Sequence, residues 1–253
     1  MITAEEIYKQ LRFLYPYEEP WDNNGILIGN PDKKITSVSI AIDPTFDIIN
    51  LCNTDMLITH HPLIFNPIKK TNKLIHKLIQ EDITYMALHT PLDYSDQANI
   101  VFCNYMDLNY NYFNTFKNGD GGQIGVIYQD RDDINNIANK YKAMCKLSKP
   151  LPLYNAKHIS NIDIEIVGFI QGAANSFLNE IIESNIDLLV TGEISHHNII
   201  ELRDNDILVM LLGHTPSELF LKTALYDSLG SLDLNLDIEI LADDSNNIFV
   251  GVK

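Results

Sequence analysis

The chain lacks long apolar runs and has few cysteines. None of its 253 residues lie in an apolar run near the roughly 18 to 20 residues that a membrane-spanning helix needs. The first six residues, MITAEE, are acidic and do not form the basic segment that begins a secretory signal, so we expect neither a membrane anchor nor export. Cys52, Cys103 and Cys145 are scattered and odd in number, which predicts reduced thiols in a cytoplasmic protein.

Positive charge is also scarce. Lys and Arg number 18 against 34 Asp and Glu, which gives a formal net charge of −16. Such a surface repels phosphate backbones, and the densest basic stretch, with lysines at positions 69, 70, 73 and 77, is short. We therefore expect no nucleic-acid partner. The excess of carboxylates suits cation binding, although solubility alone accounts for most acidic proteins.

What the chain has is an alternation of predicted strands and helices, which favours an α/β architecture. Several strands are unbroken apolar runs, typical of strands covered on both faces. A glycine-rich turn at 118–122 separates two halves, and because a strand follows it, a phosphate-binding loop is disfavoured. The expected helices cover residues 4–15, 45–52, 74–80, 98–108, 132–144, 175–184, 196–202 and 216–229. The expected strands cover residues 26–29, 38–42, 56–59, 84–88, 124–127, 162–169, 187–191, 207–212, 236–241 and 247–252.

Two stretches of the chain resemble each other. In the first, DMLITHHP at 55–62 is followed by HTPLD at 89–93. In the second, DLLVTGEISHH at 187–197 is followed by HTPSE at 214–218. Each stretch has ligand-type side chains after a buried strand, where α/β proteins bind their ligands. Two such halves facing each other can build one shared site.

His60 and His61 directly follow the first of these strands. Neighbouring side chains on a strand point to opposite faces. The pair therefore serves two ions, or one ion and one supporting contact, better than it grips a single ion. A structural, hydrogen-bonded histidine would explain one member of the pair equally well.

The two His-Thr-Pro segments allow two interpretations. A Thr, a Pro and an acidic residue three positions after the Thr are typical of a helix start, so Asp93 and Glu218 would only cap helices. Alternatively, His89 and His214 lie on the same rim as the His pair, and the carboxylates offer oxygens to an ion. Imidazole and carboxylate ligands without thiolate suit Zn²⁺, Mn²⁺ or Fe²⁺.

Glu193, His196 and His197 stand in the second copy where the first has its His pair. His196 and His197 lie farther from the strand, so we expect them on the surface of a helix and not on a metal ion. Glu193 follows the strand end directly and is a candidate for a supporting contact or for proton transfer.

Five motifs occur in an order that resembles a known family. They are WDNNG at 21–25, ITHHP at 58–62, HTPLD at 89–93, VTGE at 190–193 and GHTPSE at 213–218. Over nearly the whole chain they resemble the NIF-three-like dinuclear metal proteins, also labelled GTP cyclohydrolase 1 type 2 homologues. The resemblance implies two interlocked, internally duplicated α/β domains with mixed sheets, a metal site at the domain junction and a ring-shaped homohexamer. The domains would span residues 1–120 plus 236–253 and residues 121–235.

The resemblance also implies the roles of individual residues. Two divalent ions would be bound in each subunit, the first by His61 and Asp93, the second by His60 and His214, with Glu218 bridging them. His89, Asp22 and Glu193 fall in family motifs near the site, and we expect His89 and Glu193 to transfer protons.

The chain departs from the family pattern at two places. SDQAN at 95–99 replaces the usual Gly-Gly-x-Asn stretch, so only Asn99 keeps that pattern. The link from residue 113 to about 124 is too short for the extra domain of some members, which predicts the minimal form.

Two functions follow from the resemblance. The first is a metal-dependent hydrolase of the GTP cyclohydrolase kind with a small-molecule substrate, a nucleotide or related heterocycle, since paired ions activate water and clamp a leaving group. The alternative is a metal-stabilised, ring-shaped binding or regulatory module without turnover, whose ions would have closed coordination shells.

Overall fold

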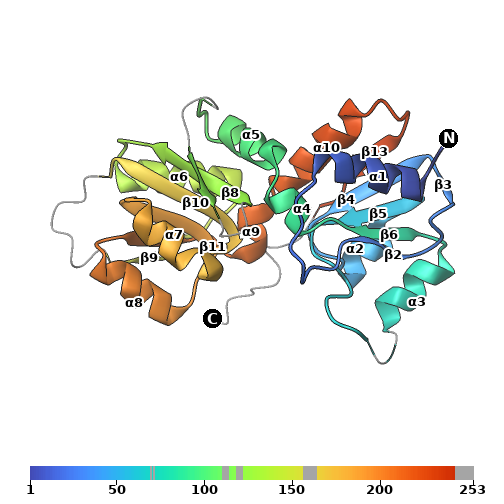
Figure 1. Ribbon diagram of the computed structural model, residues 1–253, viewed down its shortest axis with the longest axis horizontal. Helices are drawn as coiled ribbons and strands as arrows, with labels where there is room; N and C mark the ends of the chain where they lie inside the picture. Colours follow the sequence, from blue (N-terminus) through green and yellow to red (C-terminus); the bar gives the residue numbers. More distant parts are fainter. Residues whose placement is uncertain (69, 71, 110–113, 118–121, 156–163, 243–253) are drawn as a thin grey trace. The chain divides into compact units, whose positions relative to one another are not determined.

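The computed structural model is a mixed α/β protein, as expected from the sequence (Figure 1). It describes all residues except 69, 71, 110–113, 118–121, 156–163 and 243–253. The chain forms two compact units. Unit 1 comprises Met1–Gln97 and Leu221–Lys253, and unit 2 comprises Ala98–Phe220. The domain boundaries expected from the sequence lie elsewhere, at 120/121 and 235/236, and remain a prediction.

Unit 1 is built on a five-stranded sheet with the order β13-β4-β5-β6-β2. β13 (Asp237–Ile240), β4 (Ser37–Ala41), β5 (Met56–Thr59) and β6 (Thr84–Ala87) are parallel, and β2 (Gly25–Ile28) pairs antiparallel with β6. A separate two-stranded ribbon joins β1 (Ile2–Thr3) to β3 (Lys34–Ile35). All four residues of β5 are buried, because helices cover both faces of the sheet (Figure 1).

Helices lie on both faces of the unit 1 sheet (Figure 1). α1 (Ala4–Leu14) begins at a capping box of Thr3 and Glu6 and contacts α10 (Leu221–Ser231), where the Tyr15 hydroxyl donates to Ser228. α2 (Phe46–Leu51) and α3 (Lys73–Gln80) cover the other face and contact each other. Two short connecting elements complete the set, α4 (Thr90–Asp93) and the first residues of α5 (Asp96–Tyr105).

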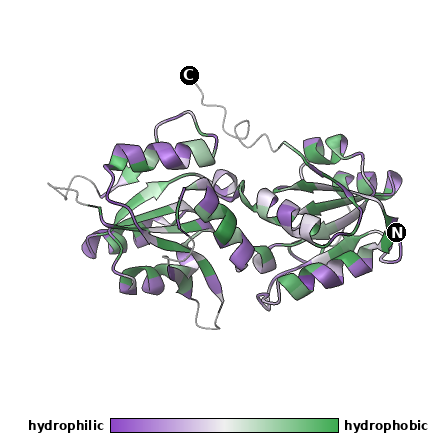
Figure 2. Cartoon of the chain, turned by 90° about the horizontal axis from the view of Figure 1, so that it is seen from above, coloured by the Kyte–Doolittle hydropathy of each residue, from purple (hydrophilic) through white to green (hydrophobic). Residues whose placement is uncertain are grey.

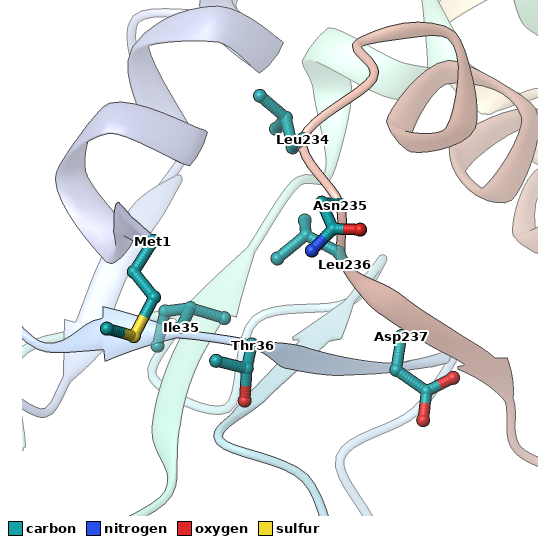
Figure 3. Close-up of a pocket in the computed structure, with 7 residues that line it drawn as sticks. All are labelled: Met1, Ile35, Thr36, Leu234, Asn235, Leu236 and Asp237. Carbon is teal, nitrogen blue, oxygen red and sulfur yellow. The ribbon is translucent and has the colours of Figure 1, made fainter.

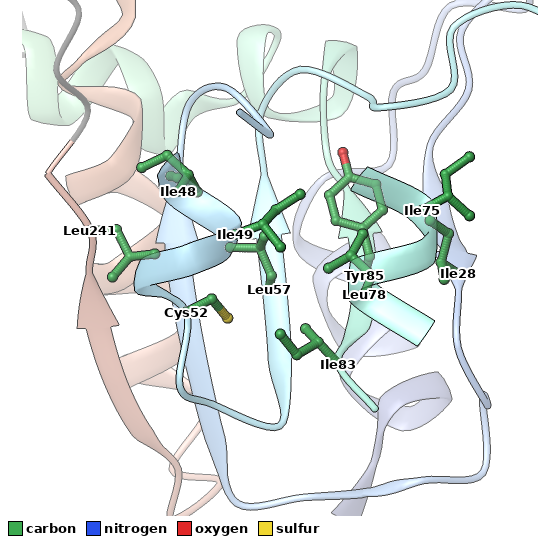
Figure 4. Packing of buried hydrophobic residues seen from close by; sticks show 11 residues of the cluster. Ile28, Ile48, Ile49, Cys52, Leu57, Ile75, Leu78, Ile83, Tyr85 and Leu241 are labelled. Carbon is green, nitrogen blue, oxygen red and sulfur yellow. The ribbon is translucent and has the colours of Figure 1, made fainter. Parts of the chain in front are cut away.

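The core beneath α2 and α3 is continuous and apolar (Figure 4). Ile48 and Ile49 of α2 and Leu78 of α3 pack on Leu57 of β5 and Tyr85 of β6. Each fully buried side chain of this size contributes about 1.5–3 kcal/mol by leaving water. This packing holds the carboxyl ends of β5 and β6 in fixed positions.

Unit 2 is built on a six-stranded sheet with the order β7-β8-β10-β11-β12-β9. β10 (Ile166–Ala173), β11 (Leu188–Glu193) and β12 (Leu208–Leu211) are parallel. β8 (Gln123–Gln129) pairs antiparallel with β10 and with β7 (Asn114–Lys117), and β9 (Leu153–Tyr154) pairs antiparallel with β12. Figure 2 shows hydrophobic residues concentrated on the strands of both sheets.

Helices flank the unit 2 sheet as well (Figure 1). They are α5, α6 (Ile134–Met144), the 3-10 turn η3 (Asn175–Phe177), α7 (Leu178–Glu183), α8 (His196–Asp204) and α9 (His214–Glu218). Phe102 of α5 stacks on Phe169 of β10, with ring centroids 4.2 Å apart, and Tyr141 of α6 joins the same cluster. α5 and α6 therefore cover the same face of the sheet.

The two sheets repeat one connection pattern, as the duplicated sequence predicts. In unit 1 the parallel strands follow the order β4, β5, β6, and in unit 2 they follow the order β10, β11, β12. Next to the third strand of each set lies an antiparallel strand from earlier in the chain, β2 beside β6 and β9 beside β12. The carboxylate of Asp55 accepts hydrogen bonds from the backbone at the start of β4. Asp187 does the same before β10.

Backbone hydrogen bonds also fix the register of the repeat. Thr59 O accepts from Leu88 N, and Thr191 O accepts from Leu212 N, each at 2.9 Å. In this register the His pair corresponds to Gly192 and Glu193. Placing His196 and His197 opposite the His pair is therefore wrong, because these residues belong to the following helix.

The repeats exchange one helix. α5 follows the first repeat along the chain, but from Ala98 onward it belongs to unit 2. α10 follows the second repeat but belongs to unit 1, where it contacts β4, β13 and α1. The interlocking that the resemblance implied thus consists of one helix from each repeat completing the other unit.

Most expected elements form close to their predicted bounds, and three differ. The helix expected at 175–184 forms as the 3-10 turn η3 followed by α7. The helix expected at 216–229 is divided into α9 and α10, because the chain passes from unit 2 to unit 1 between Phe220 and Leu221. The strand expected at 162–169 instead covers Ile166–Ala173, with an irregularity in pairing between Ile170 and Ala173. The strand expected at 247–252 and most of the glycine-rich turn lie outside the described residues.

Two further expectations concern cysteine and membranes. All three cysteines are free and buried, in agreement with the sequence. Within the described residues, no helix combines the length and apolarity that crossing a bilayer requires.

Candidate metal centre

His60 and His61 lie at the carboxyl end of β5, where backbone hydrogen bonds to the neighbouring strand continue. His60 N donates to Ala41 O at 3.2 Å, and His61 N donates to Ile42 O at 3.0 Å. His60 is 1% exposed and His61 is partly buried. Their ring centroids are 4.8 Å apart.

His89 joins this pair from the end of the adjacent strand, β6. Its backbone N donates to Asn24 Oδ1 at 2.7 Å, and its ring lies edge-on to His60 with the centroids 5.0 Å apart. His60, His61 and His89 each offer one ring nitrogen such that these atoms all lie within 4.8 Å of one another. We call these three residues the histidine cluster. The sequence placed His89 only near the metal site, but its ring nitrogen lies close enough to those of His60 and His61 for all three to contact one metal ion.

Carboxylates hold two rings of the histidine cluster. Asp43 Oδ1 lies 2.7 Å from His61 Nδ1, and Asp22 Oδ1 lies 2.9 Å from His89 Nδ1. When Nδ1 of a neutral imidazole donates to a carboxylate, the lone pair that binds metal is on Nε2. Such carboxylate–histidine pairs orient and polarise histidine ligands in metal sites.

Asp22 is tied to the backbone as well as to His89. Its Oδ2 accepts from Thr90 N at 2.9 Å and from Thr90 Oγ1 at 2.6 Å. Burial alone would raise the pKa of Asp22, but the hydrogen bond and charge of His89 and the bonds from Thr90 hold it well below its usual range. Burial lowers the pKa of His89, and the bond to Asp22 with the charges of Asp93 and Asp22 outweighs this and raises it.

Asp93 lies in α4 beside the histidine cluster. It is 8% exposed, and its Oδ1 is 3.7 Å from His60 Nε2. The interpretation that Thr90 and Asp93 form a helix cap is wrong. His89 occupies the N-cap position without a side-chain cap bond, and the Thr90 hydroxyl donates to Asp22 instead.

The loop after Asp93, where the chain departs from the family pattern, is buried around two of its residues. Ser95 is 5% exposed, and its Oγ donates to Leu92 O at 2.7 Å. Asn99, the residue that keeps the pattern, is 4% exposed within α5.

A second set of metal-ligand-type residues lies in unit 2. His214, the first residue of α9, has Nδ1 3.0 Å from Glu193 Oε1 and Nε2 3.1 Å from Glu218 Oε1. Glu218 is 2% exposed, whereas Glu193 is exposed at the end of β11. Glu193 therefore holds His214 as Asp43 holds His61.

The capping interpretation fails for the second segment too. Gly213 is the N-cap residue of α9, and no side chain caps the helix. Glu218 is the last residue of α9, and its carboxylate contacts His214 and does not cap the helix.

The carboxylate of Glu218 fits beside glycines, because a side chain at these positions would fill the space. Gly172 has φ +60°, and a Cβ at this position would lie 2.5 Å from Glu218 Oε1. A Cβ on Gly192 would lie 2.4 Å from Gly172 O and 2.6 Å from Ser217 Oγ. Ser217 Oγ accepts from Gly172 N at 2.8 Å and donates to His214 O at 2.6 Å. The backbone of β10 and β11 is thus shaped around His214 and Glu218.

His196 and His197 are exposed at the start of α8. This agrees with the expectation that they are surface residues of a helix. His197 Nε2 lies 3.2 Å from Ser195 Oγ of the same turn.

Four further residues shape these sites. Gly192 and Ser217 lie in the VTGE and GHTPSE motifs without an expected role, and Asp43 and Gly172 lie outside the motifs. Asp43 carried a usable signal, because it ends the strand before Pro44 on the same rim as the His pair. Gly172 carried none, since the contact with Glu218 that requires a glycine there joins segments far apart in the sequence.

The donors present fit a divalent metal. Three imidazoles of unit 1 converge, two of them oriented by carboxylates, and unit 2 pairs an imidazole with a buried carboxylate. Nitrogen and oxygen donors of this kind suit Zn²⁺, Mn²⁺ or Fe²⁺. Clusters of His and Glu that can hold metal ions are therefore present on the chain.

A cavity of about 450 Å³ lies elsewhere in unit 1 (Figure 3). Ile35 and Thr36 line it just before β4, and Leu236 and Asp237 line it at the start of β13. The histidine cluster follows the carboxyl ends of strands parallel to these. The cavity is therefore at the opposite end of the sheet and is separate from the candidate metal centre.

Comparisons with known proteins agree with this architecture. A curated protein of Campylobacter jejuni named GTP cyclohydrolase 1 type 2 homolog is 26% identical over 254 residues, covering 94% of this chain and 97% of the relative. A Methanocaldococcus jannaschii protein of the same name is 28% identical over 233 residues, covering 88% of this chain and 91% of the relative.

Solved structures share the fold. A Staphylococcus aureus hypothetical protein superposes with a TM-score of 0.84 at 21% identity over 99% of both chains. A Bacillus cereus protein related to NIF3 superposes with a TM-score of 0.80 at 18% identity, covering 100% of this chain and 99% of that one. The family model described as Duf34/NIF3 (NGG1p interacting factor 3) matches residues 2–247. The chain therefore belongs to the Duf34/NIF3 family.

Proposed function

We propose that this protein binds two divalent metal ions and is a metal-dependent hydrolase of the GTP cyclohydrolase 1 type 2 kind, acting on a nucleotide or related heterocycle. The observation that carries the proposal is the histidine cluster, in which the rings of His61 and His89 are oriented by Asp43 and Asp22. A purely structural histidine needs one hydrogen bond and has no reason to gather with two others. The names of the curated relatives supply the reaction class.

The ligand assignment in this proposal follows the family resemblance. His61 and Asp93 would hold one ion, His60 and His214 would hold the other, and Glu218 would be the ligand that the two ions share. Two distances within the units bring proposed ligands together: Asp93 Oδ1 lies 3.7 Å from His60 Nε2, and Glu218 Oε1 lies 3.1 Å from His214 Nε2. Divalent ions in such a site supply Lewis-acid activation of water and of the substrate.

Two further residues transfer protons in the proposed reaction. Asp22 holds Nδ1 of His89, so the Nε2 atom of His89 is the one that exchanges a proton with the substrate. Glu193 is exposed at the end of β11 and holds His214 through Nδ1. Its second carboxylate oxygen accepts or returns a proton.

The experiment compares metal content and turnover of the wild type with those of Glu218→Gln. Purified protein is loaded with Mn²⁺ or Zn²⁺, dialysed and offered a panel of nucleotides. We expect about two retained ions per chain, and a turnover that Glu218→Gln lowers at least about 100-fold, since even indirect partners of metal ligands cost 10- to 100-fold. His197→Ala, an exposed histidine on α8, is the matched control and should behave like the wild type.

If the wild type and Glu218→Gln release product at the same background rate, the proposed hydrolase activity is refuted. If both ions are nevertheless retained, the alternative of a metal-stabilised binding module takes its place. We also propose the ring-shaped homohexamer and the cytoplasmic location that were expected from the sequence. Sedimentation at six times the chain mass of 28.8 kDa would support the ring, and a monomer would exclude it.

A further inference from the structure

Two large aromatic side chains are exposed beside the histidine cluster. Trp21 is 58% exposed and Phe65 is 48% exposed. Their ring centroids are 5.8 Å apart with an interplanar angle of 40°. We call these two residues the aromatic pair. Trp21 precedes β2, and Phe65 follows β5, so two separate loops of unit 1 bring the rings together.

Both loops are tied down next to the aromatic rings. Asp22, adjacent to Trp21, has a side chain with no exposed surface and bonds to His89 and Thr90. Asn23 Nδ2 donates to Ile64 O, which joins the two loops directly. On the other loop, Leu63 N donates to the buried Tyr85 hydroxyl at 2.8 Å. The aromatic pair therefore stands on fixed backbone.

The aromatic pair borders the histidine cluster through His89. The His89 ring lies edge-on to both members, with centroids 6.0 Å from Trp21 and 5.9 Å from Phe65. The same ring also lies edge-on to His60, with the centroids 5.0 Å apart. The His89 ring thus contacts both exposed aromatic rings and a proposed metal ligand.

The exposure of Trp21 and Phe65 does not stabilise the fold. Aromatic side chains gain stability by burial, whereas these rings keep about half of their surface in water on a backbone that the surrounding hydrogen bonds fix. Exposed apolar surface that is contiguous and rimmed by polar groups marks a place where something binds. Indole and phenyl faces recognise planar rings by stacking, which tolerates differences between bases.

We propose that the aromatic pair is the platform on which the planar heterocycle of the substrate stacks, beside the histidine cluster. The inference rests on the proposed function, because it names the part of the same site that recognises the substrate. It assigns Trp21 and Phe65 to substrate binding and to no step of the reaction. Specificity for a heterocycle over a plain sugar phosphate would then come from unit 1.

The single tryptophan of the chain makes the proposal directly measurable. Because Trp21 is the only tryptophan, its fluorescence reports on this position alone. The Mn²⁺-loaded protein is titrated with guanosine 5′-monophosphate and, separately, with ribose 5-phosphate, which lacks the base. We expect saturable quenching by the nucleotide and none by the sugar phosphate.

A matched pair of variants tests the second ring. Phe65→Leu removes the aromatic face beside Trp21, and Phe13→Leu makes the same change on α1, where Phe13 is 86% exposed. We expect Phe65→Leu to weaken nucleotide binding at least about fivefold, as loss of one stacking partner does. Phe13→Leu should leave the affinity unchanged, and both variants should retain as much Mn²⁺ as the wild type.

The platform is refuted if the two ligands quench Trp21 alike, if neither quenches it, or if the two variants bind equally. Metal content separates this failure from failure of the proposed function. Wild type that retains Mn²⁺ without base-dependent quenching overturns only the platform. If the wild type retains no Mn²⁺, the proposed metal function is overturned. The metal-free protein is then titrated with guanosine, and quenching of Trp21 fluorescence supports the platform, whereas its absence refutes it.

Discussion

His61, His89 and His214 share one arrangement, in which Nδ1 faces a carboxylate. The partners are Asp43, Asp22 and Glu193, and the distances lie between 2.7 and 3.0 Å. Removing such a partner frees the ring to rotate and to change tautomer, which costs metal affinity even though no ligand is lost. The carboxylates are therefore part of the proposed metal centre as much as the imidazoles are.

Gly172→Ala tests whether the space reserved for Glu218 matters. An Ala at φ +60° costs about 1 kcal/mol in backbone strain, and its Cβ would displace the Glu218 carboxylate. We expect a lower melting temperature and loss of retained metal after dialysis. Gly230→Ala in α10 is the control, because a Cβ there meets nothing within 4 Å and alanine favours helix by up to about 1 kcal/mol. Full metal retention by Gly172→Ala would contradict a ligand role for Glu218.

At the scale of single residues, the sequence indicated where the candidate site is but not how it is held. The His pair and His89 were predictable because ligands gather where parallel strands end. The role of Asp22 could not be read beyond its motif, since its bonds reach His89 and Thr90 across more than sixty residues of the chain. Long-range side-chain partners leave no periodic signal in a sequence.

Among the secondary-structure elements, the starts of β4 and β10 are each fixed by one aspartate. Asp55 accepts from the backbone and hydroxyl groups of Thr36 and Ser37, at distances between 2.7 and 3.2 Å. Burial is the largest single influence and would raise the pKa of Asp55, but the hydrogen bonds from Thr36 and Ser37 together outweigh it and lower the pKa. A carboxylate that holds a strand end in this way stabilises the folded state only while it is ionised.

Asp55→Asn should lower the free energy of unfolding by about 1–2 kcal/mol at pH 7, because an amide is a poorer acceptor for several donors. Since the folded pKa is depressed, this contribution is present above the unfolded pKa and is lost as pH falls through the folded pKa. Urea unfolding at pH 7 and below about pH 4 should therefore show the difference between variant and wild type shrinking in acid. A difference that stays constant with pH would show that the carboxylate charge is not responsible.

Elements that are buried on both faces were predictable, and short edge elements were not. β5 forms at the predicted residues because an unbroken apolar run has few alternatives to a central strand. β7 and β9 lie at the edges of their sheet and have only four and two residues. β7 has one apolar residue in four, and β9 is too short to show a pattern and forms on β12, a strand far away in the sequence.

Across the whole molecule, the exchange of α5 and α10 makes each half of the chain dependent on the other. We expect that a fragment of residues 1–109 and a fragment of residues 114–253, expressed together, purify as one complex on a tag carried by either. Expressed alone, each fragment leaves an apolar helix unpacked and a sheet face uncovered, and should aggregate. Phe102→Ala in the first fragment removes the ring stacked on Phe169, a loss of about 3–5 kcal/mol, and should weaken co-purification. Two fragments that each fold as soluble monomers would contradict the exchange.

The same exchange bears on how the chain arose. A lone ancestral copy would have ended in a helix that its own sheet did not bind, and two such copies would have satisfied each other by domain swapping. Fusion of the two genes would then preserve the swap within a single polypeptide, where the halves no longer have to stay identical. One half was free to keep the paired imidazoles and the other to keep the buried carboxylate, so a symmetric ancestor can give rise to an asymmetric site without any change of fold.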